Sequence, residues 1–599
     1  MKRIPIISIV LIAILSLIGV ANVQSQEQGL MTRWGAEVSP DNVLPEYPRP
    51  QLVREDWLNL NGLWDYAITD RIADQPEQFD GEILVPFAIE SALSGVRGRI
   101  SFGDRLWYHR TFEVPANWQD KRILLHFGAV DWETVVWVNG IEIGAHRGGY
   151  DAFSFDITDA LSDSGIQEIF VAVWDPTDFG VQARGKQVDR PGGIWYTPTT
   201  GIWQTVWLEP VPETSITALK IVPDVDAQVL RLEATIEGDT ETYQLRVEAF
   251  NGDTVVAEII RNVDDTFELV IEDPKLWSPD SPYLYDLRVT LINEDTVIDE
   301  ITSYFGMRKI SIEQASDGAM RLFLNNEPLF HFGLLDQGFW PDGLYTAPSD
   351  EALRYDIEVT RQLGFNTIRK HVKVEPARWY YWADRLGVLV WQDMPNGDSH
   401  AGYGDGEIER IPVSVEQFEL ELTRLIDTHS NHPSIVMWVI FNEGWGQYDT
   451  ARLADWLQSY DPTRLVNSAS GWNDMQVGDV YDIHSYPGPD APSSSDDRAS
   501  LLGEFGGLGL PIEGHMWQEE FWGYRAYEDS ESLLQAYRDL IEKLDDLINT
   551  QGLAAAIYTQ TTDVETEVNG MMTYDREIIK MDWEQVSSIN NELYQLDIP

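Results

Sequence analysis

Two glutamates in the C-terminal half of the sequence follow apolar runs, where a buried strand would end. Glu443 comes after residues 435–441 and Asn442, and Glu504 follows residues 500–503. Desolvation at the end of an apolar strand raises a carboxyl pKa, which a general acid needs near neutral pH. Two carboxylates that face one site are the groups that cleave glycosidic bonds, one as proton donor and one as nucleophile. The alternative is that each glutamate forms a salt bridge at the rim of the fold.

The elements around these glutamates alternate between apolar strands and helical stretches from about residue 305. We predict strands at 329–333, 365–369, 388–391, 434–441, 464–468, 480–484, 501–505 and 554–559. Helices are predicted at 349–363, 375–386, 415–429, 450–460 and 530–549, with a last one after Asp575. Eight strands, most of them followed by helices, predict a TIM barrel, whose active sites lie at the C-terminal strand ends. A doubly wound open sheet is the alternative.

The sequence before residue 305 has the pattern of short strands that is typical of β-sandwiches. Short strands broken by Gly, Pro and Asp fill residues 49–212, and two of them flank Asn139-Gly140. Asn-Gly between strands is a strong signal for a type I′ hairpin. Alternating strands continue over residues 213–304, a length that suits an immunoglobulin-like sandwich. We therefore expect two sandwiches ahead of the barrel.

Composition excludes several classes of function. The 599 residues include 42 Lys and Arg against 99 Asp and Glu, so the formal net charge is −57. Nucleic-acid binding needs cations to displace counterions, so a nucleic-acid partner is not expected. There are no cysteines, which excludes disulfides and thiolate sites. The 23 tryptophans suit large β cores and also flat contacts with sugar rings.

The first 25 residues have the layout of a secretory signal peptide. Lys2-Arg3 is followed by an apolar stretch over residues 4–20 and then by small residues suited to cleavage. The mature chain would begin near Gln26 and be secreted or periplasmic, with no membrane contact after cleavage. An uncleaved anchor is the alternative, because the apolar stretch is at the short limit for a membrane span.

Several motifs resemble those of glycoside hydrolase family 2, the family of β-galactosidases, β-glucuronidases and β-mannosidases. They lie at residues 106–112, 127–132, 136–140, 146–153, 200–207, 305–308, 441–443 and 503–506. The resemblance implies a jelly-roll sandwich over residues 26–212, an immunoglobulin-like sandwich over 213–304 and a catalytic (β/α)8 TIM barrel over 305–599. It also implies a retaining double displacement with Glu443 as acid/base and Glu504 as nucleophile.

The resemblance extends to neighbouring residues. Asn442 would hydrogen-bond the sugar 2-OH, Arg369 would keep the nucleophile ionised, and Tyr486 would lie near it. The other candidate substrate-binding residues end predicted barrel strands or lie in adjoining loops: Asp336, His371, Asp393, His484, His515, Trp517 and Gln560. Asp175, in a loop of the first sandwich, is a candidate because the corresponding loop reaches the barrel mouth in some relatives. For each, the alternative is a packing or hydrogen-bonding role at the rim.

The sugar is predicted from one missing lysine. The β-glucuronidase branch carries Asn-x-Lys before a segment that here begins at Gly570, and this chain has Glu567, Val568 and Asn569 instead. A uronic carboxylate would meet Glu567 rather than a cation. We therefore expect an exo-enzyme for terminal neutral sugars of an oligo- or polysaccharide, with β-galactoside first. β-Mannoside, β-glucoside or a rarer sugar is the alternative.

Other properties are expected or left open. No ligand cluster or phosphate-binding loop stands out, so neither a metal nor a cofactor is expected. A homo-oligomer stays open. A catalytically inactive carbohydrate-binding protein and a cell-surface adhesion protein are alternatives, but neither gives the two barrel glutamates a purpose.

Overall fold

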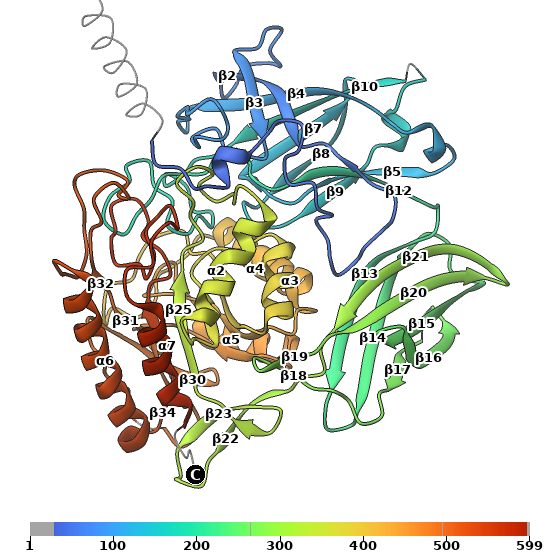
Figure 1. Cartoon of the computed structure of the whole chain (residues 1–599). Helices are drawn as coiled ribbons and strands as arrows, with labels where there is room; N and C mark the ends of the chain where they lie inside the picture. The colour runs from blue at the N-terminus through green and yellow to red at the C-terminus, as the bar shows by residue number, and fades with distance from the viewer. Residues whose placement is uncertain (1–28, 164, 264, 494, 596–599) are drawn as a thin grey trace, which may run out of the picture.

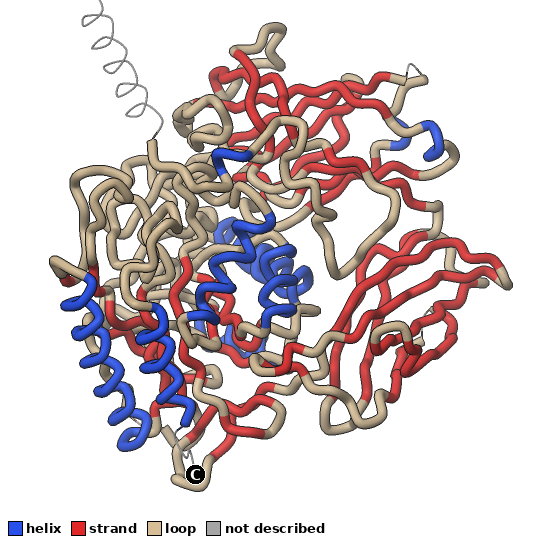
Figure 2. The backbone as a smooth tube through the Cα atoms, in the orientation of Figure 1, coloured by secondary structure: helices blue, strands red, loops and turns tan. Residues whose placement is uncertain are grey.

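The computed structural model describes residues 29–163, 165–263, 265–493 and 495–595, which form two β-sandwiches and a barrel (Figure 1). Strands dominate the two sandwiches, and the long helices belong to the barrel (Figure 2). The predicted signal peptide at residues 1–25 lies outside the described residues. Within the described ranges, none of the helices has the length and apolar character needed to cross a membrane.

The first sandwich packs a six-stranded antiparallel sheet against a four-stranded one. The larger sheet has the order β3 (Gly81–Val85), β2 (Gly62–Asp70), β4 (Asp104–Glu113), β10 (Ile166–Trp174), β7 (Glu133–Val138) and β8 (Ile141–Arg147). The smaller has the order β1 (Leu58–Asn59), β12 (Val206–Val211), β5 (Arg122–Phe127) and β9 (Phe153–Asp156). Residues alternate between buried and half-buried along β7, as a sheet with one face on the core requires. The predicted β7–β8 hairpin is present, with φ of 50° at Asn139 and 77° at Gly140.

The second sandwich has seven strands in two sheets. One sheet has the order β13 (Ser215–Asp224), β14 (Val229–Glu237) and β17 (Phe267–Val270). The other has the order β16 (Thr254–Asn262), β15 (Tyr243–Asn251), β20 (Tyr285–Asn293) and β21 (Thr296–Phe305). Several hydrogen bonds dock this domain on the barrel. Trp277 Nε1 donates to the Asp384 carbonyl at 2.7 Å, and Asn431 Nδ2 donates to the Leu219 carbonyl at 2.8 Å.

A small sheet precedes the barrel and was not predicted. It consists of β22 (Ile310–Gln314), β23 (Met320–Leu324) and β24 (Glu327–Pro328). Leu322 and Leu324 are buried in one hydrophobic cluster with residues of the barrel strands. Arg321 donates to the carbonyls of Leu553 at 2.8 Å and Ile548 at 3.0 Å, which fastens the sheet to the barrel.

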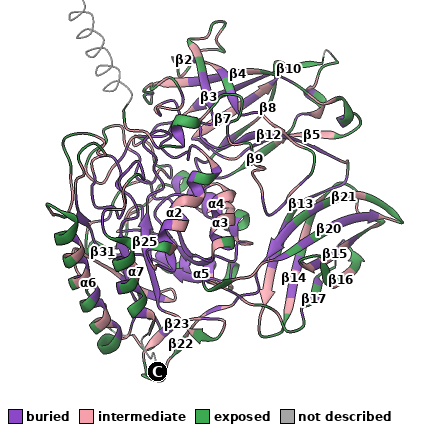
Figure 3. Ribbon diagram, viewed as in Figure 1, coloured by how far each residue is buried: buried purple, intermediate pink, exposed green. Residues whose placement is uncertain are grey.

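The barrel strands form one parallel sheet of eight in which the first strand pairs with the last. The order is β29 (Leu465–Asn467), β28 (Ile435–Val439), β27 (Leu389–Asp393), β26 (Thr367–Lys370), β25 (His331–Asp336), β34 (Leu553–Thr559), β31 (Ala499–Gly506) and β30 (Val480–Ser485). Because β25 pairs with both β26 and β34, the sheet wraps round, which rules out the doubly wound alternative. The predicted TIM barrel is confirmed, and most of its strands are buried (Figure 3).

Side chains join β29 to β30, the pair that completes the ring. Asp482 Oδ2 on β30 accepts from Asn467 Nδ2 at 2.7 Å and from Ser470 Oγ at 2.6 Å. The other carboxylate oxygen accepts from the Gly503 amide at 2.6 Å. One carboxylate therefore links three consecutive strands at the level of the site.

The barrel helices match the predicted order. They are α2 (Asp350–Gln362), α3 (Ala377–Leu386), α4 (Pro412–His429), α5 (Thr450–Tyr460), α6 (Ser530–Gln551) and α7 (Trp583–Glu592). Ser349 caps α2 by accepting from the Ala352 amide, and Asp529 caps α6 by accepting from the Ser532 amide. In the described residues, loops rather than helices join β29 to β30 and β30 to β31.

A long loop of the first sandwich crosses to the barrel, and we call residues 175–200 the strap (teal in Figure 1). It joins β10 to β11 (Gly201–Ile202). The amides of Arg184 and Gly185 donate to the Asn396 carbonyl beyond β27, at 2.8 and 3.0 Å. Gly185 has φ of +60°, and a Cβ added there would lie 2.5 Å from the Val372 carbonyl oxygen. Glycine therefore lets the strap backbone lie directly on the barrel loop after β26.

Candidate active site

Glu443 lies just beyond β28 in a strained backbone conformation. Its φ is 53°, and its amide donates to the Ser470 carbonyl at 2.9 Å. A non-glycine residue in the left-handed region costs on the order of 1–3 kcal/mol, and such residues cluster at functional sites. The turn places the carboxylate beside β30, where His484 Nδ1 lies 2.8 Å from Oε1.

Glu504 lies on β31, and both of its oxygens have protein partners. Arg369 Nη1 donates to Oε1 at 3.3 Å, and the Tyr486 hydroxyl donates to Oε2 at 2.6 Å. These two donors fix the orientation of the carboxylate. The arrangement suits a nucleophile, which must be charged and correctly positioned before it attacks.

The two carboxylates are close enough to act on one bond. One oxygen of Glu443, one nitrogen of His484 and one oxygen of Glu504 all lie within 4.8 Å of one another. Retaining glycosidases hold their two carboxyl groups about 5–5.5 Å apart, whereas inverting enzymes need about 6.5–9.5 Å to admit a water. The spacing agrees with the retaining geometry.

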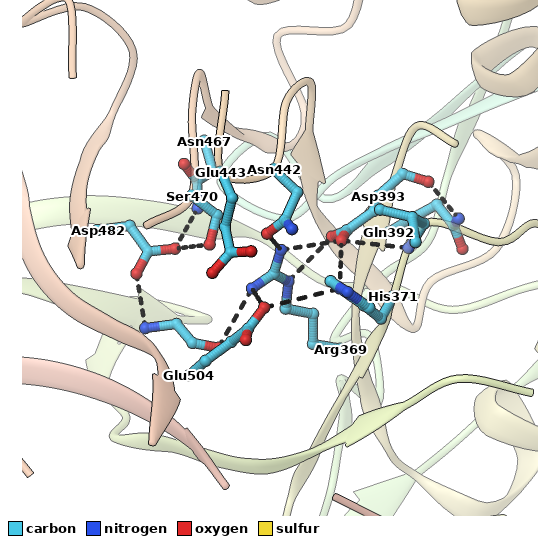
Figure 4. Close-up of polar contacts among 12 residues, drawn as sticks. Arg369, His371, Gln392, Asp393, Asn442, Glu443, Asn467, Ser470, Asp482 and Glu504 are labelled. Atoms are coloured by element: carbon cyan, nitrogen blue, oxygen red, sulfur yellow. Dashed lines mark hydrogen bonds and ion pairs between the residues drawn. The ribbon is translucent and has the colours of Figure 1, made fainter. Parts of the chain in front are cut away.

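Arg369 is the hub of the site, at the centre of the contacts in Figure 4. Its guanidinium is fully buried on β26. Nε and Nη2 donate to the two oxygens of Asp393 at 3.1 and 2.9 Å. Nη2 also donates to Asn442 Oδ1 at 2.8 Å. Since that oxygen is occupied by Arg369, the Asn442 Nδ2 is the amide group left to meet a ligand.

His371 completes the wall beside Arg369. Its Nδ1 lies 3.2 Å from Asp393 Oδ2 and 3.8 Å from Glu504 Oε1. Burial lowers the pKa of His371 well below its usual range, in spite of the charge on Glu504. The ring is therefore neutral at neutral pH and acts as a hydrogen-bonding group rather than a cation.

His484 sits between the catalytic carboxylates and changes the expected electrostatics. Burial acts to lower the pKa of His484, but the charges of Glu504 and Glu443 outweigh it and raise that pKa. Burial acts to raise the pKa of Glu443, but the hydrogen bond and charge of His484 outweigh it and lower that pKa. Our expectation of a raised Glu443 pKa is therefore wrong for this structure. The proton of the pair resides on His484.

The remaining predicted residues are placed around this centre and have other partners. Asp336 pairs with Lys370 Nζ at 2.6 Å, and His515 Nδ1 lies 2.7 Å from Asp575. Gln560 Nε2 donates to Asn569 Oδ1 at 2.8 Å. Trp517 packs edge-on against Tyr574 with ring centroids 5.7 Å apart. None of these contacts reaches Glu443 or Glu504.

Asp175 lies in the first sandwich, where its carboxylate accepts from two threonines. The Thr177 amide donates to it at 2.7 Å and the Thr200 hydroxyl at 2.9 Å. The side chain thus ties the two ends of the strap together. Its role as a substrate-binding residue stays a prediction.

Sequence reasoning missed three features of the site. Tyr524 stacks on Tyr486 with ring centroids 4.0 Å apart, and Ser470 Oγ contacts His484 Nε2 at 2.8 Å. Lys186, on the strap, is buried close to the barrel residues of the site. The one available signal was the length of the strap, since a connection of this length between sandwich strands is commonly functional.

Glu443, His484 and Glu504 also form a group whose donor atoms are near enough to hold a metal ion. Within the described residues each already has protein partners: His484 for Glu443, and Arg369 and Tyr486 for Glu504. The prediction that no metal is required stays a prediction.

Comparisons with known proteins agree with this architecture. Three models of glycosyl hydrolases family 2 match: the sugar binding domain over residues 58–208, the family model over 214–308 and the TIM barrel domain over 345–493. The chain is 28% identical over 356 residues to a β-galactosidase of Thermoanaerobacter pseudethanolicus, covering 57% of this chain and 45% of the relative. It is 25% identical over 439 residues to a β-glucuronidase of Bacteroides fragilis, covering 70% and 61%.

The chain spans about half the length of the curated relatives it matches. A solved β-D-glucuronidase of Dictyoglomus thermophilum superposes with a TM-score of 0.73 at 18% identity, over 92% of this chain and 99% of that one. This likeness concerns the fold. With its sugar binding domain, second sandwich and TIM barrel all matched, the chain belongs to glycosyl hydrolases family 2.

Proposed function

We propose that this protein is a retaining exo-β-glycosidase in which Glu504 is the nucleophile and Glu443 the acid/base. The observation that carries the proposal is the spacing of the two carboxylates, whose closest donor atoms lie within 4.8 Å. The partners divide the roles. Glu504 is oriented by hydrogen bonds from Arg369 and Tyr486, whereas Glu443 pairs with His484, which can supply it with a proton.

The reaction follows from these positions. Glu504 attacks the anomeric carbon while Glu443 passes a proton, which it takes from His484, to the leaving oxygen. This gives a covalent glycosyl-enzyme and a free aglycone. Water then attacks the same carbon, Glu443 takes its proton, and Glu504 leaves as a carboxylate. Asn442 Nδ2 would bond the sugar 2-OH and strengthen that bond in the transition state.

The first candidate sugar is a β-galactoside, and a β-uronide stands beside it. The relatives named above include both a β-galactosidase and a β-glucuronidase. Our sequence argument against uronides placed Glu567 opposite the uronic carboxylate. In the structure Tyr196 donates to one oxygen of Glu567, and Asn569 Nδ2 donates to the other at 3.0 Å. Burial raises the pKa of Glu567 in spite of these hydrogen bonds, which favours its neutral form and weakens the argument.

The test uses the purified protein and a panel of 4-nitrophenyl β-glycosides, with proton NMR of the first anomer released. We expect one sugar to be cleaved with retention. Glu504→Ala and Glu443→Ala should each lower kcat by at least about 10³-fold. The control is Glu513→Ala, an exposed glutamate in the loop after β31, which should keep full activity.

Azide separates the two roles. With Glu443→Ala, azide attacks the glycosyl-enzyme and the product is the β-glycosyl azide. With Glu504→Ala, azide attacks the substrate directly and the product is the α-glycosyl azide. The reverse assignment, or release of the inverted sugar by the wild type, would refute the proposed roles. Binding of glycans without any turnover would favour an inactive carbohydrate-binding protein.

We also propose that the protein works outside the cytoplasm, on the basis of residues 1–25 alone. Expression of the full chain with a C-terminal tag, followed by fractionation and N-terminal sequencing, tests this. A new N-terminus near Gln26 in the secreted or periplasmic fraction is expected. An intact N-terminus in the membrane fraction would instead indicate an anchor.

A further inference from the structure

Lys186 brings a positive charge from the first sandwich to the barrel mouth. Its backbone follows Gly185, which lies against the Val372 carbonyl next to His371. The Tyr196 amide donates to the Lys186 carbonyl at 3.0 Å, and the Tyr196 hydroxyl donates to Glu567. The segment is therefore fixed on both sides by groups of the catalytic centre.

The charge of Lys186 affects the pKa values of three residues: His371, Glu443 and Glu567. Burial lowers the pKa of His371, and the charge of Lys186 adds to this after the opposing effect of Glu504. Burial acts to raise the pKa values of Glu443 and Glu567, and the charge of Lys186 is among the effects that oppose the rise. The Trp195 ring, whose centroid is 5.5 Å from Nζ, packs against Trp445, two residues after Glu443, so the ammonium group lies on this side of the site.

Lys186 has no ionic partner of its own among the described residues. Its side chain is nine-tenths buried, with 9% of the residue exposed. No acceptor hydrogen-bonds its Nζ there, and no carboxylate oxygen lies within 4.0 Å. Its Nζ lies 5.5 Å from the centroid of the Trp195 ring, which makes a weak cation–π interaction. Nζ itself keeps some exposure to solvent, so its charge is available to a ligand.

Other buried cations of the barrel have acceptors: Arg308 donates to the carbonyls of Pro433, Thr463 and Ile435, and others form ion pairs. The pairs are Lys370 with Asp336, Lys373 with Glu375, Arg369 with Asp393, Arg576 with Asp356 and Lys580 with Asp563. The whole chain carries 99 acidic residues against 42 basic ones, so acidic partners are abundant. The exception among these cations therefore lies beside the catalytic residues, where a ligand can supply the missing anion.

We propose that Lys186 binds an anionic substituent, a carboxylate or a sulfate ester, on the sugar that this enzyme cleaves. The inference rests on the proposed glycosidase function and narrows its substrate class to acidic β-glycosides. It departs from the neutral sugar expected from the sequence, because the cation comes from the strap rather than from the segment before Gly570. Lys186 is thus a specificity-determining residue supplied by another domain.

The experiment measures selectivity rather than activity alone. Wild type, Lys186→Met and Lys186→Arg are compared on matched 4-nitrophenyl β-glycosides: galactoside with galacturonide, glucoside with glucuronide, and galactoside with its 6-sulfate. Lys186→Met should lower kcat/KM on the preferred acidic substrate by about 10- to 200-fold, the range for a hydrogen bond to a charged group. It should change the neutral partner less than about 3-fold. Lys186→Arg should retain part of the selectivity.

The choice of substrate distinguishes the two anions, and Lys220→Met, at an exposed lysine of β13, is the matched control. An equal fall on acidic and neutral partners would overturn the proposal, because Lys186 would then only offset the charge of the glutamates. No change on any substrate would overturn it as well.

A binding measurement keeps this proposal separate from the proposed reaction. Calorimetry compares galacturonate and glucuronate with galactose and glucose on wild type and Lys186→Met. Tighter binding of the acids that is lost in Lys186→Met supports the proposal even if no glycoside is turned over. Equal binding of acids and neutral sugars by the wild type, with no preference in turnover, would overturn it.

Discussion

At the scale of single residues, the site is built on hydrogen bonds that leave few donors free. Arg369 uses its guanidinium on Asp393, Asn442 and Glu504, so it orients the site but has little left for a ligand. Asn442 differs, since its oxygen is used and its amide nitrogen is available. We therefore expect the substrate 2-OH to depend on Asn442 Nδ2 as its side-chain donor.

Asn442→Ala tests this dependence. We expect kcat/KM to fall about 10²- to 10³-fold on a substrate with a 2-OH, the usual loss for a donor that acts in the transition state. On the matched 2-deoxy substrate the same substitution should cost less than about 5-fold. The two ratios form a cycle that isolates the Asn442–2-OH interaction. Equal losses on both substrates would mean that Asn442 acts through Arg369 instead.

His484 gives a pH-dependent prediction. Its pKa is raised in the folded protein against the opposing effect of burial, mainly by Glu504 and Glu443. The stability it contributes is fully present below its unfolded pKa of about 6.5 and is lost as pH rises through the raised value. The difference in Tm between wild type and His484→Gln should therefore be largest at low pH and shrink as the pH rises above about 6.5.

His371 is the matched control for that measurement. Burial lowers its pKa, so protonation below about pH 6.5 favours the unfolded chain. The cost of His371→Gln should therefore decrease as the pH falls, the opposite of the trend at His484. Parallel trends for the two variants would contradict the assignment of the proton to His484.

The residues found from sequence are those that follow apolar strands. Glu443 and Glu504 stand out because a charged residue at the end of a buried strand has few structural explanations. Lys186 was missed because the site residues that its charge affects, His371 and Glu443, are distant in sequence and because its own loop is polar. The lowered pKa of Glu443 could not be predicted either, since it depends on a contact between β28 and β30.

At the scale of elements, hydrophobic period predicted the barrel helices closely and the strand ends less well. The predicted helix 450–460 matches α5, because the apolar spacing and the following Asp461-Pro462 define it. The predicted strand 329–333 begins later, at His331, and extends to Asp336. The β22–β24 sheet was missed because its short strands follow the same alternating pattern as the strands of the preceding sandwich. Only tertiary contacts assign it to the barrel.

Arg321 tests the importance of that small sheet. Its removal would leave two buried carbonyls without a donor. Arg321→Ala should lower the free energy of unfolding by about 2–3 kcal/mol, seen as a lower Tm by calorimetry. At 25 °C, kcat/KM should stay unchanged, because the sheet does not contact the catalytic residues.

The control for this variant is Arg288→Ala, at a half-exposed arginine whose nearest carboxylate oxygens are 3.8 and 4.0 Å away. It should change stability by less than about 0.5 kcal/mol. A similar Tm for both variants would show that the sheet adds nothing to barrel stability.

At the scale of the whole molecule, charge is the dominant feature. With a formal net charge of −57, the folded protein repels itself and repels acidic polymers. The buried cation on the strap then matters more, because an acidic substrate must be attracted locally against the overall field. Salt screens that field over about 30 Å at 0.01 M and about 8 Å at 0.15 M.

We expect Tm to rise when NaCl is increased from about 0.01 to 0.5 M, with most of the change below about 0.15 M. KCl should act equally, since screening does not depend on the cation. The check is a calorimetric series in both salts at constant pH. A fall in Tm with salt would mean that attractive ion pairs outweigh the repulsion.

The contact of the strap with the barrel also determines when the protein can first act during its biosynthesis. The first sandwich leaves the ribosome early and can fold there, because domains fold as units from the N-terminus. β25, however, completes its pairing only when β34 has been translated more than two hundred residues later. Until then the strap has no closed ring to lie on and Glu504 has no fixed neighbours. We therefore expect a nascent chain to remain inactive until β34 has been translated.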